Sequence, residues 1–171
     1  MTRALAPLGP PSALVFATTN GGKHRRLREH LDRVECDARA RCVAVDVDEI
    51  QADTVRLVAV DKARRACERL KRDVDDDECV LVHDCGLCAR ALGGFPGPVT
   101  KYFNFTVGGA GLAKLLRDVD DRAACWDETI VCARPSDGAM RVFSRERAYD
   151  GEIGTPVRWR RWRDDPSRSV G

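Results

Sequence analysis

The alternation of apolar and polar stretches along the chain predicts a series of short strands and amphipathic helices. Residues 13–17 (Ala-Leu-Val-Phe-Ala) form a continuous apolar run of the kind that a buried strand shows. In residues 23–33, Leu27 and Leu31 are four positions apart and therefore share one face of a helix. The same reasoning predicts strands at 41–47, 79–82, 124–133 and 140–147, and helices at 54–73 and 111–119. We therefore expect a fold that mixes helices and strands.

Turn-forming residues separate these segments. Thr18-Thr19-Asn20-Gly21-Gly22 follows the first strand, and residues 93–98 are too rich in Gly and Pro for a helix or strand. Residues 135–138 predict the turn of a hairpin, and Thr54 is a typical helix N-cap. The acidic run 73–78 is interpreted as a solvated turn, with a Mg²⁺ or Ca²⁺ cluster as the alternative.

Length and composition limit the class of protein. A chain of 171 residues with 43% hydrophobic residues predicts one domain over 1–171, with a flexible N-terminus at 1–12 and a basic, aromatic tail at 155–171. The net charge of +2 excludes a strongly basic nucleic-acid module. The short Arg-Trp-Arg-Arg-Trp-Arg run at 158–163 leaves nucleic-acid binding as a minor alternative.

Location follows from two further observations. No apolar run approaches the roughly 20 residues that a membrane-spanning helix needs. The eight cysteines of a chain with its own core do not need to form disulfides, so we expect a reduced, cytoplasmic protein without a membrane partner.

Three features are typical of a site for nucleotide phosphates. Thr18-x-Asn20-x-x-Lys23 lies at a strand-to-helix turn, where backbone N–H groups favour an anion; a helix cap followed by an incidental Lys is the alternative. Asp48-Glu49 precedes a helix that carries Lys62. Residues 80–84 (Val-Leu-Val-His-Asp) leave a carboxylate at the expected end of a buried strand. Only five of the 29 basic residues are Lys, a compact charge suited to phosphate.

In this order the motifs resemble the inosine triphosphate pyrophosphatase family, over residues 13–153. The most specific part is 80–103, which contains Gly86-Leu87, Ala-Leu-Gly-Gly at 91–94 and Pro-Gly at 96–97, followed by Lys101 and an aromatic residue. Glu49-x-Gln51 and the segment 58–63 match the family's metal carboxylate and second helix. The resemblance implies a long mixed β-sheet flanked by helices, an α/β fold with two lobes and a cleft between them.

The resemblance also implies an activity: Mg²⁺-dependent hydrolysis of non-standard purine nucleoside triphosphates (ITP, dITP, XTP) to monophosphate and pyrophosphate, which cleanses the nucleotide pool. It implies a homodimer as well. The implied site residues are Asn20 and Lys23 on the triphosphate, with Thr18 shaping the loop; Glu49 on Mg²⁺; Asp84 on Mg²⁺ or as the base for the attacking water; and Lys62 and Lys101 on phosphate charge.

Two departures from the family pattern bear on activity. His83 stands where an acidic residue or Ala is usual, which predicts a weakened metal site, with a His base as the alternative. Near the end of the chain, Trp162-Arg163-Asp164-Asp165-Pro166 resembles the family's base-stacking segment, but no counterpart of its Ser-His-Arg segment follows. Trp162 is the candidate stacking residue. The rival hypothesis is therefore a degenerate nucleotide-binding or interaction protein of the same fold.

Cys85-Gly86-Leu87-Cys88 suggests a more distant alternative, a thiol-redox protein, because Cys-x-x-Cys pairs can have a lowered thiol pKa. An ordinary or raised pKa of these thiols would oppose that hypothesis. A zinc site is not expected from this motif, because the sequence has no second pair of that spacing.

Overall fold

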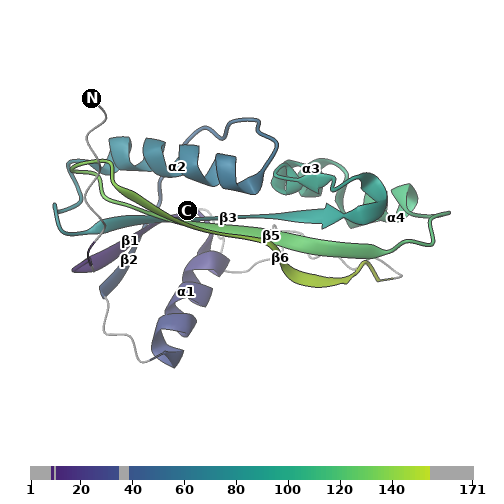
Figure 1. Ribbon diagram of the computed structural model, residues 1–171, viewed down its shortest axis with the longest axis horizontal. Coiled ribbons are helices and arrows are strands. Elements are labelled where there is room, and N and C mark those ends of the chain that lie inside the picture. The colour runs from purple at the N-terminus through teal and green to yellow at the C-terminus, as the bar shows by residue number, and fades with distance from the viewer. Residues whose placement is uncertain (1–8, 10, 35–38, 155–171) are drawn as a thin grey trace, which may run out of the picture. The chain divides into compact units, whose positions relative to one another are not determined.

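The computed structural model describes residues 9, 11–34 and 39–154 of the chain. Figure 1 shows strands and helices alternating along most of its length. The strands are β1 (Ala13–Ala17), β2 (Arg39–Val43), β3 (Cys79–Ala89), β4 (Pro96–Gly97), β5 (Ala123–Ala133) and β6 (Met140–Glu152). The helices are α1 (Gly21–Arg33), α2 (Val55–Leu70), α3 (Thr100–Thr106), α4 (Gly108–Leu115) and the short 3₁₀ turn η1 (Arg90–Leu92).

The strands form one mixed sheet of six strands. Their order is β2-β1-β3-β5-β6, and β4 pairs with β3 outside this path. Strand β1 is parallel to both β2 and β3, with Val15 opposite Arg41 on one side and Val80 on the other. The short β4 runs antiparallel to β3, with Gly97 opposite Leu87. The expected α/β fold, a mixed sheet flanked by helices, is confirmed.

The described chain divides into two compact units. The first unit contains the described residues up to Ile50, together with Val58–His83 and Thr129–Phe143. The second contains Gln51–Leu57, Asp84–Glu128 and the described residues from Ser144. Strand β3 therefore passes from the first unit into the second at the peptide bond between His83 and Asp84.

The core of the first unit lies between α2 and the sheet. Ala59, Ala63 and Ala66 recur at helical spacing on α2 and pack against Val80 and Val82 of β3. Small side chains on this helix allow its backbone to approach the strands closely. In Figure 1, α1 lies on the opposite face of these strands. Helix α1 buries only Gly22, so the sheet holds it mainly through its first turn.

The second unit has its own core around α3 and α4. Leu112 and Leu116 are fully buried, and Phe103 and Leu87 pack with them. Thr100, at the start of α3, is buried and fully satisfied: its Oγ1 donates to Gly97 O (2.6 Å) and accepts from Leu87 N (2.8 Å). Its hydroxyl therefore ties α3 to β3 and β4.

Most predicted elements are present, with several corrections. The strand predicted at 41–47 lies at Arg39–Val43, so residues 44–47 are outside it. The strand predicted at 79–82 continues to Ala89, so the expectation that Asp84 ends a buried strand is wrong. Residues 93–98 contain the two-residue strand β4, and helix α3 was not predicted. The helix predicted at 111–119 begins and ends earlier, at Gly108 and Leu115. The predicted hairpin forms, and Gly138 supplies the positive φ (73°) that its turn requires.

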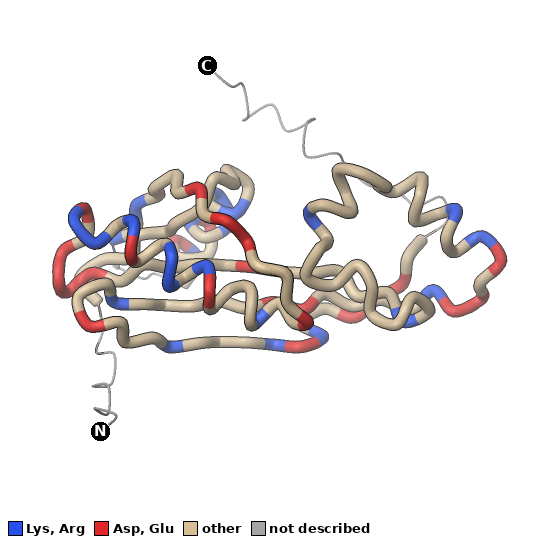
Figure 2. The backbone as a smooth tube through the Cα atoms, turned by 90° about the horizontal axis from the view of Figure 1, so that it is seen from above, with Lys and Arg blue, Asp and Glu red and all other residues tan. Residues whose placement is uncertain are grey.

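Charge and hydropathy agree with the composition. Figure 2 shows acidic and basic segments interspersed along the described chain rather than gathered by sign, consistent with a net charge of +2. Within the described residues, no helix is both long enough and apolar enough to cross a membrane.

Candidate functional site

The turn between β1 and α1 is built around Asn20. Its Oδ1 accepts hydrogen bonds from Gly22 N (2.9 Å) and Lys23 N (3.2 Å), so Asn20 is the N-cap of α1. Thr18 Oγ1 accepts from Asn20 N (3.0 Å) and fixes the approach to the cap. Thr18 and Asn20 thus hold the turn together, and Asn20 caps the helix N-terminus that an anion would meet.

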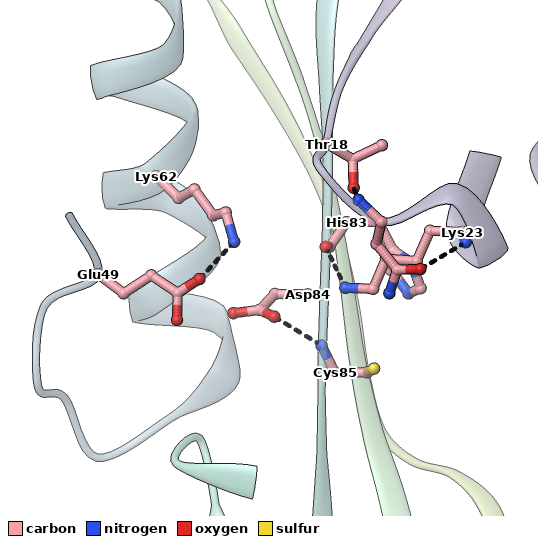
Figure 3. Close-up of polar contacts among 8 residues, drawn as sticks. Thr18, Lys23, Glu49, Lys62, His83, Asp84 and Cys85 are labelled. Carbon is pink, nitrogen blue, oxygen red and sulfur yellow. Dashed lines mark hydrogen bonds and ion pairs between the residues drawn. The ribbon is translucent and has the colours of Figure 1, made fainter. Parts of the chain in front are cut away.

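Lys23 extends from the first turn of α1 to β3. Its Nζ donates to the His83 carbonyl oxygen at 2.7 Å, a contact drawn in Figure 3. No residue pattern predicts this contact, because its acceptor is a backbone carbonyl 60 positions away, which leaves no signature in residue type. It places a cation at the peptide bond that joins His83 to Asp84.

Lys62 and Glu49 form the second charged contact of the first unit. Lys62 Nζ lies 2.7 Å from Glu49 Oε1, and only 19% and 14% of the two side chains are exposed. Val47, which is buried, anchors the connection that carries Glu49. Figure 3 shows Lys62 and Lys23 reaching toward β3 from α2 and α1, on opposite sides of the strand. Two of the predicted phosphate lysines therefore flank the same part of the sheet.

Asp84 lies within β3 and is half-buried. Its Oδ1 accepts a hydrogen bond from Cys85 N at 3.1 Å, which orients the carboxylate. Side chains alternate along a strand, so Asp84 faces away from its neighbours His83 and Cys85; Figure 3 shows Asp84 and Cys85 leaving β3 in opposite directions. His83 therefore cannot replace an acidic ligand on the face of β3 that presents Asp84.

The two remaining predicted residues are placed differently. Lys101 is exposed in the first turn of α3, in the second unit, and its Nζ is 5.7 Å from the centroid of the Tyr102 ring. Trp162 lies outside the described residues, as does the rest of the tail at 155–171.

The Cys88 thiol opposes the redox alternative. Burial, together with the nearby Asp127 carboxylate, raises the pKa of Cys88 to about 12, the opposite of what a nucleophilic thiol needs. Cys88 also has neighbours that its own motif did not predict: Cys125 and Asp127 of β5. The only available signal was their spacing of two, which places both on one face of a strand.

Comparison with known proteins gives a consistent result. The sequence pattern of the Ham1 family matches residues 14–161. A dITP/XTP pyrophosphatase of Hyperthermus butylicus is 37% identical over 131 residues, 77% of this chain and 64% of its own length. A dITP/XTP pyrophosphatase of Methanopyrus kandleri is 35% identical over 140 residues, 82% of this chain and 66% of its own. The chain thus spans just under two thirds of the length of these curated relatives.

Solved structures agree on the fold. The crystal structure of a nucleoside-triphosphatase / dITP/XTP pyrophosphatase from Mycobacterium abscessus has a TM-score of 0.59 at 19% identity, covering 82% of this chain and 72% of the other. The Ham1 protein of Staphylococcus aureus also has a TM-score of 0.59, at 23% identity, with 83% and 72% covered. At these identities the likeness concerns the fold.

Proposed function

This chain belongs to the Ham1 family, and on that premise we propose that it hydrolyses non-standard purine nucleoside triphosphates (ITP, dITP or XTP) to the monophosphate and pyrophosphate. The observation that carries the proposal is the Lys23 contact, because it brings a phosphate-type cation from a capped helix N-terminus to the peptide bond preceding Asp84. The names of the Hyperthermus butylicus and Methanopyrus kandleri relatives support dITP and XTP as substrates, and the name of a Trypanosoma cruzi relative, inosine triphosphate pyrophosphatase 2, supports ITP.

In this proposal the turn at 18–23 receives the triphosphate. The N-terminus of α1 carries no acidic residue in its first turn, so nothing there repels an anion. Lys23 would exchange its bond to the His83 carbonyl for a phosphate oxygen, a stronger partner because the oxygen is charged. Asn20 and Thr18 would hold the turn in shape during the exchange.

The carboxylates Glu49 and Asp84 suit Mg²⁺ as the cofactor. Mg²⁺ prefers oxygen ligands and usually binds through one or two carboxylates, with water and substrate phosphate completing its shell. Glu49 already contacts a cation, so its charge is balanced before any metal arrives. Mg²⁺, if bound, would supply positive charge to the phosphates. Lys62 would add its own charge to the phosphates from α2.

Asp84 is proposed as the base that takes a proton from the attacking water. Its hydrogen bond from Cys85 N fixes one oxygen, so the carboxylate keeps one orientation while the water attacks the α-phosphorus. Pyrophosphate would leave with its negative charge balanced by Lys23 and Lys62. Lys101, exposed at the start of α3, is also proposed to neutralise negative charge on the phosphates. Trp162 remains the proposed stacking residue.

The deciding experiment measures pyrophosphate release from ITP, dITP, XTP, ATP and GTP, with Mg²⁺ and with EDTA. We expect Mg²⁺-dependent release that favours ITP, dITP or XTP.

Asp84→Asn, a nearly isosteric change, should lower turnover by about 10²–10⁴-fold, the range for loss of a general base. Asp84→Asn with unchanged turnover would remove Asp84 from the mechanism.

Lys23→Ala tests substrate placement. It should weaken triphosphate binding more than monophosphate binding, while Lys71→Ala, which removes an exposed lysine from the same unit, should change neither. Equal losses for both nucleotides would contradict the proposed position of Lys23.

The second candidate is a nucleotide-binding chain with weak catalysis, which the departure from the family pattern at His83 implies. That candidate predicts nucleotide binding without pyrophosphate release.

We also propose a homodimer, which sedimentation equilibrium would test.

A further inference from the structure

Strands β3 and β5 bring two thiols and one carboxylate together in the second unit. Cys88 comes from β3, and Cys125 and Asp127 come from one face of β5. Their ligand atoms all lie within 4.8 Å of one another, and no other group of this kind occurs in the part of the chain that the structure describes. Cys125 is buried, while Cys88 and Asp127 are half-buried. The cluster is therefore enclosed and still reachable by a small ion.

The separations suit tetrahedral coordination by thiolate and carboxylate. With metal–sulfur and metal–oxygen bonds of about 2.3 and 2.1 Å, two ligands at the tetrahedral angle lie about 3.6 Å apart. Cys88 Sγ and Asp127 Oδ2 are 3.5 Å apart. Two sulfurs on the same ion would lie about 3.8 Å apart, within the 4.8 Å span of the cluster. Only small side-chain rotations are needed to enclose an ion.

The carboxylate of Asp127 is held in the orientation that such a site needs. Its Oδ1 accepts a hydrogen bond from Arg147 N at 2.8 Å, so Oδ2 is the oxygen presented to Cys88. Arg147 has a φ of 53°, the only positive value among the described non-glycine residues. A bulky residue adopts this conformation only when its surroundings impose it. Hydrogen bonds to a metal-binding side chain from a neighbouring group orient the ligands in known metal sites.

Without a cation the cluster keeps its protons. Burial and the Asp127 carboxylate raise the pKa of Cys88 to about 12. The same two causes raise the pKa of Cys125, although Arg147 acts in the opposite direction. A divalent cation among the three groups reverses this balance, because it stabilises both thiolates and satisfies the carboxylate.

We propose that Cys88, Cys125 and Asp127 bind a thiophilic divalent cation of the Zn²⁺ class, with a fourth position open to water or another donor. Each ion bound displaces two protons, one from each thiol, which pass to solvent. The sulfur ligands select against Mg²⁺, which prefers oxygen. The proposal does not depend on the nucleotide chemistry, because it uses none of the residues assigned to that reaction.

The test uses the full-length, reduced, metal-free protein and Cd²⁺ as the probe. We expect one equivalent of Cd²⁺ to bind, with ultraviolet thiolate-to-cadmium charge-transfer absorption and release of two protons into a weakly buffered indicator solution. Cys88→Ser and Cys125→Ser should each lower the Cd²⁺ affinity by more than roughly 10–100-fold, the cost of losing only a hydrogen-bond partner of a metal ligand.

The matched control is Cys132→Ser, because Cys132 and Cys79 also contact one another through their thiols in the other unit. It should leave Cd²⁺ affinity unchanged, and none of the serine variants should change pyrophosphate release. Cd²⁺ affinity unchanged in both Cys88→Ser and Cys125→Ser, or lost in Cys132→Ser, would overturn the proposal.

Asp127→Asn supplies a second route if a serine variant fails to fold. It should weaken Cd²⁺ binding while the two-proton release and the charge-transfer band persist, because both thiols remain. Co²⁺ should give the intense visible absorption of a tetrahedral site. Weak, octahedral-type Co²⁺ absorption in the unaltered protein would contradict the proposed geometry.

Discussion

Two half-buried carboxylates, Glu49 and Asp127, illustrate two ways of keeping a negative charge inside a fold. Glu49 faces Lys62 at 2.7 Å, so its charge is already compensated. Asp127 faces the neutral Cys88 thiol and the Arg147 amide, and forms no ion pair within the described residues. The first arrangement can exchange its cation with a charged substrate, whereas the second gains a cationic partner only when an ion enters. Charge compensation, rather than burial alone, distinguishes the two sites.

The largest effect in this comparison is expected for Lys62→Met. Loss of one preorganised donor typically lowers turnover by about 10²–10³-fold, about 2.7–4 kcal/mol of transition-state stabilisation. Turnover of ITP measures the effect, and Cd²⁺ binding at the thiol cluster should not change. Equal losses of ITP turnover and Cd²⁺ affinity would mean that the Glu49 and Asp127 sites depend on one another.

Gly86→Ala should disturb the part of β3 between the two sites. A Cβ on Gly86 would overlap the Gly97 carbonyl oxygen and lie 2.9 Å from Val55 Cγ2, so β4 must move. Overpacking of this kind costs about 1–3 kcal/mol of unfolding free energy. Denaturant unfolding measures it, and both turnover and Cd²⁺ affinity should fall. Unchanged stability would contradict the close approach of β4 to β3.

Thr100→Val tests a polar group whose partners are all protein. Removing the buried hydroxyl leaves Leu87 N–H and the Gly97 carbonyl unsatisfied, at a cost of about 1–3 kcal/mol. Thr100→Ser keeps the hydroxyl and serves as the control in the same denaturant titration. A valine variant as stable as the serine variant would show that water replaces the lost partner.

The smallest effect is expected at an exposed pair. Arg134 donates two hydrogen bonds to Asp137 and holds the pKa of that carboxyl at about 2, below its ordinary value of about 3.9. The pair therefore stabilises the fold above the ordinary value and loses this contribution as pH falls through about 2. Asp137→Asn should flatten the fall in Tm between about pH 4 and pH 2. Arg134→Gln should reproduce that flattening, and a full slope in both variants would exclude the pair as its cause.

The local features of the candidate site were predictable, and the long-range ones were not. The turn at Thr18–Lys23 and the cap at Asn20 follow from residues a few positions apart. The extension of β3 was missed because the apolar run stops at His83, although strand pairing continues beyond it. Helix α3 has only seven residues and no clear helical period. The substrate, metal and catalytic roles of all the predicted site residues stay predictions: Thr18, Asn20, Lys23, Glu49, Lys62, Asp84, Lys101 and Trp162.

The spacing of the Cys85-x-x-Cys88 motif does not predict which groups Cys88 contacts. The Cys85-x-x-Cys88 spacing drew attention to a pair along β3, but the contacts of Cys88 lie across the sheet, 37 and 39 positions later in the chain. Side chains three apart in a strand point to opposite faces, so that pair cannot share an ion while β3 stays extended. Strand pairing, which spacing does not encode, decides which thiols meet.

Because β3 is continuous, its length sets the distance between Asp84 and the thiol cluster. Asp84 and Cys88 are four positions apart in one strand, and at about 3.3 Å per residue their Cα atoms are about 13 Å apart. That exceeds the screening length of about 8 Å at physiological ionic strength. An ion at the thiols should thus leave the proposed Mg²⁺ requirement at Asp84 unchanged in physiological salt. In dilute buffer, where screening reaches about 30 Å, two cations on one strand would repel, and filling one site would raise the Mg²⁺ concentration needed to fill the other.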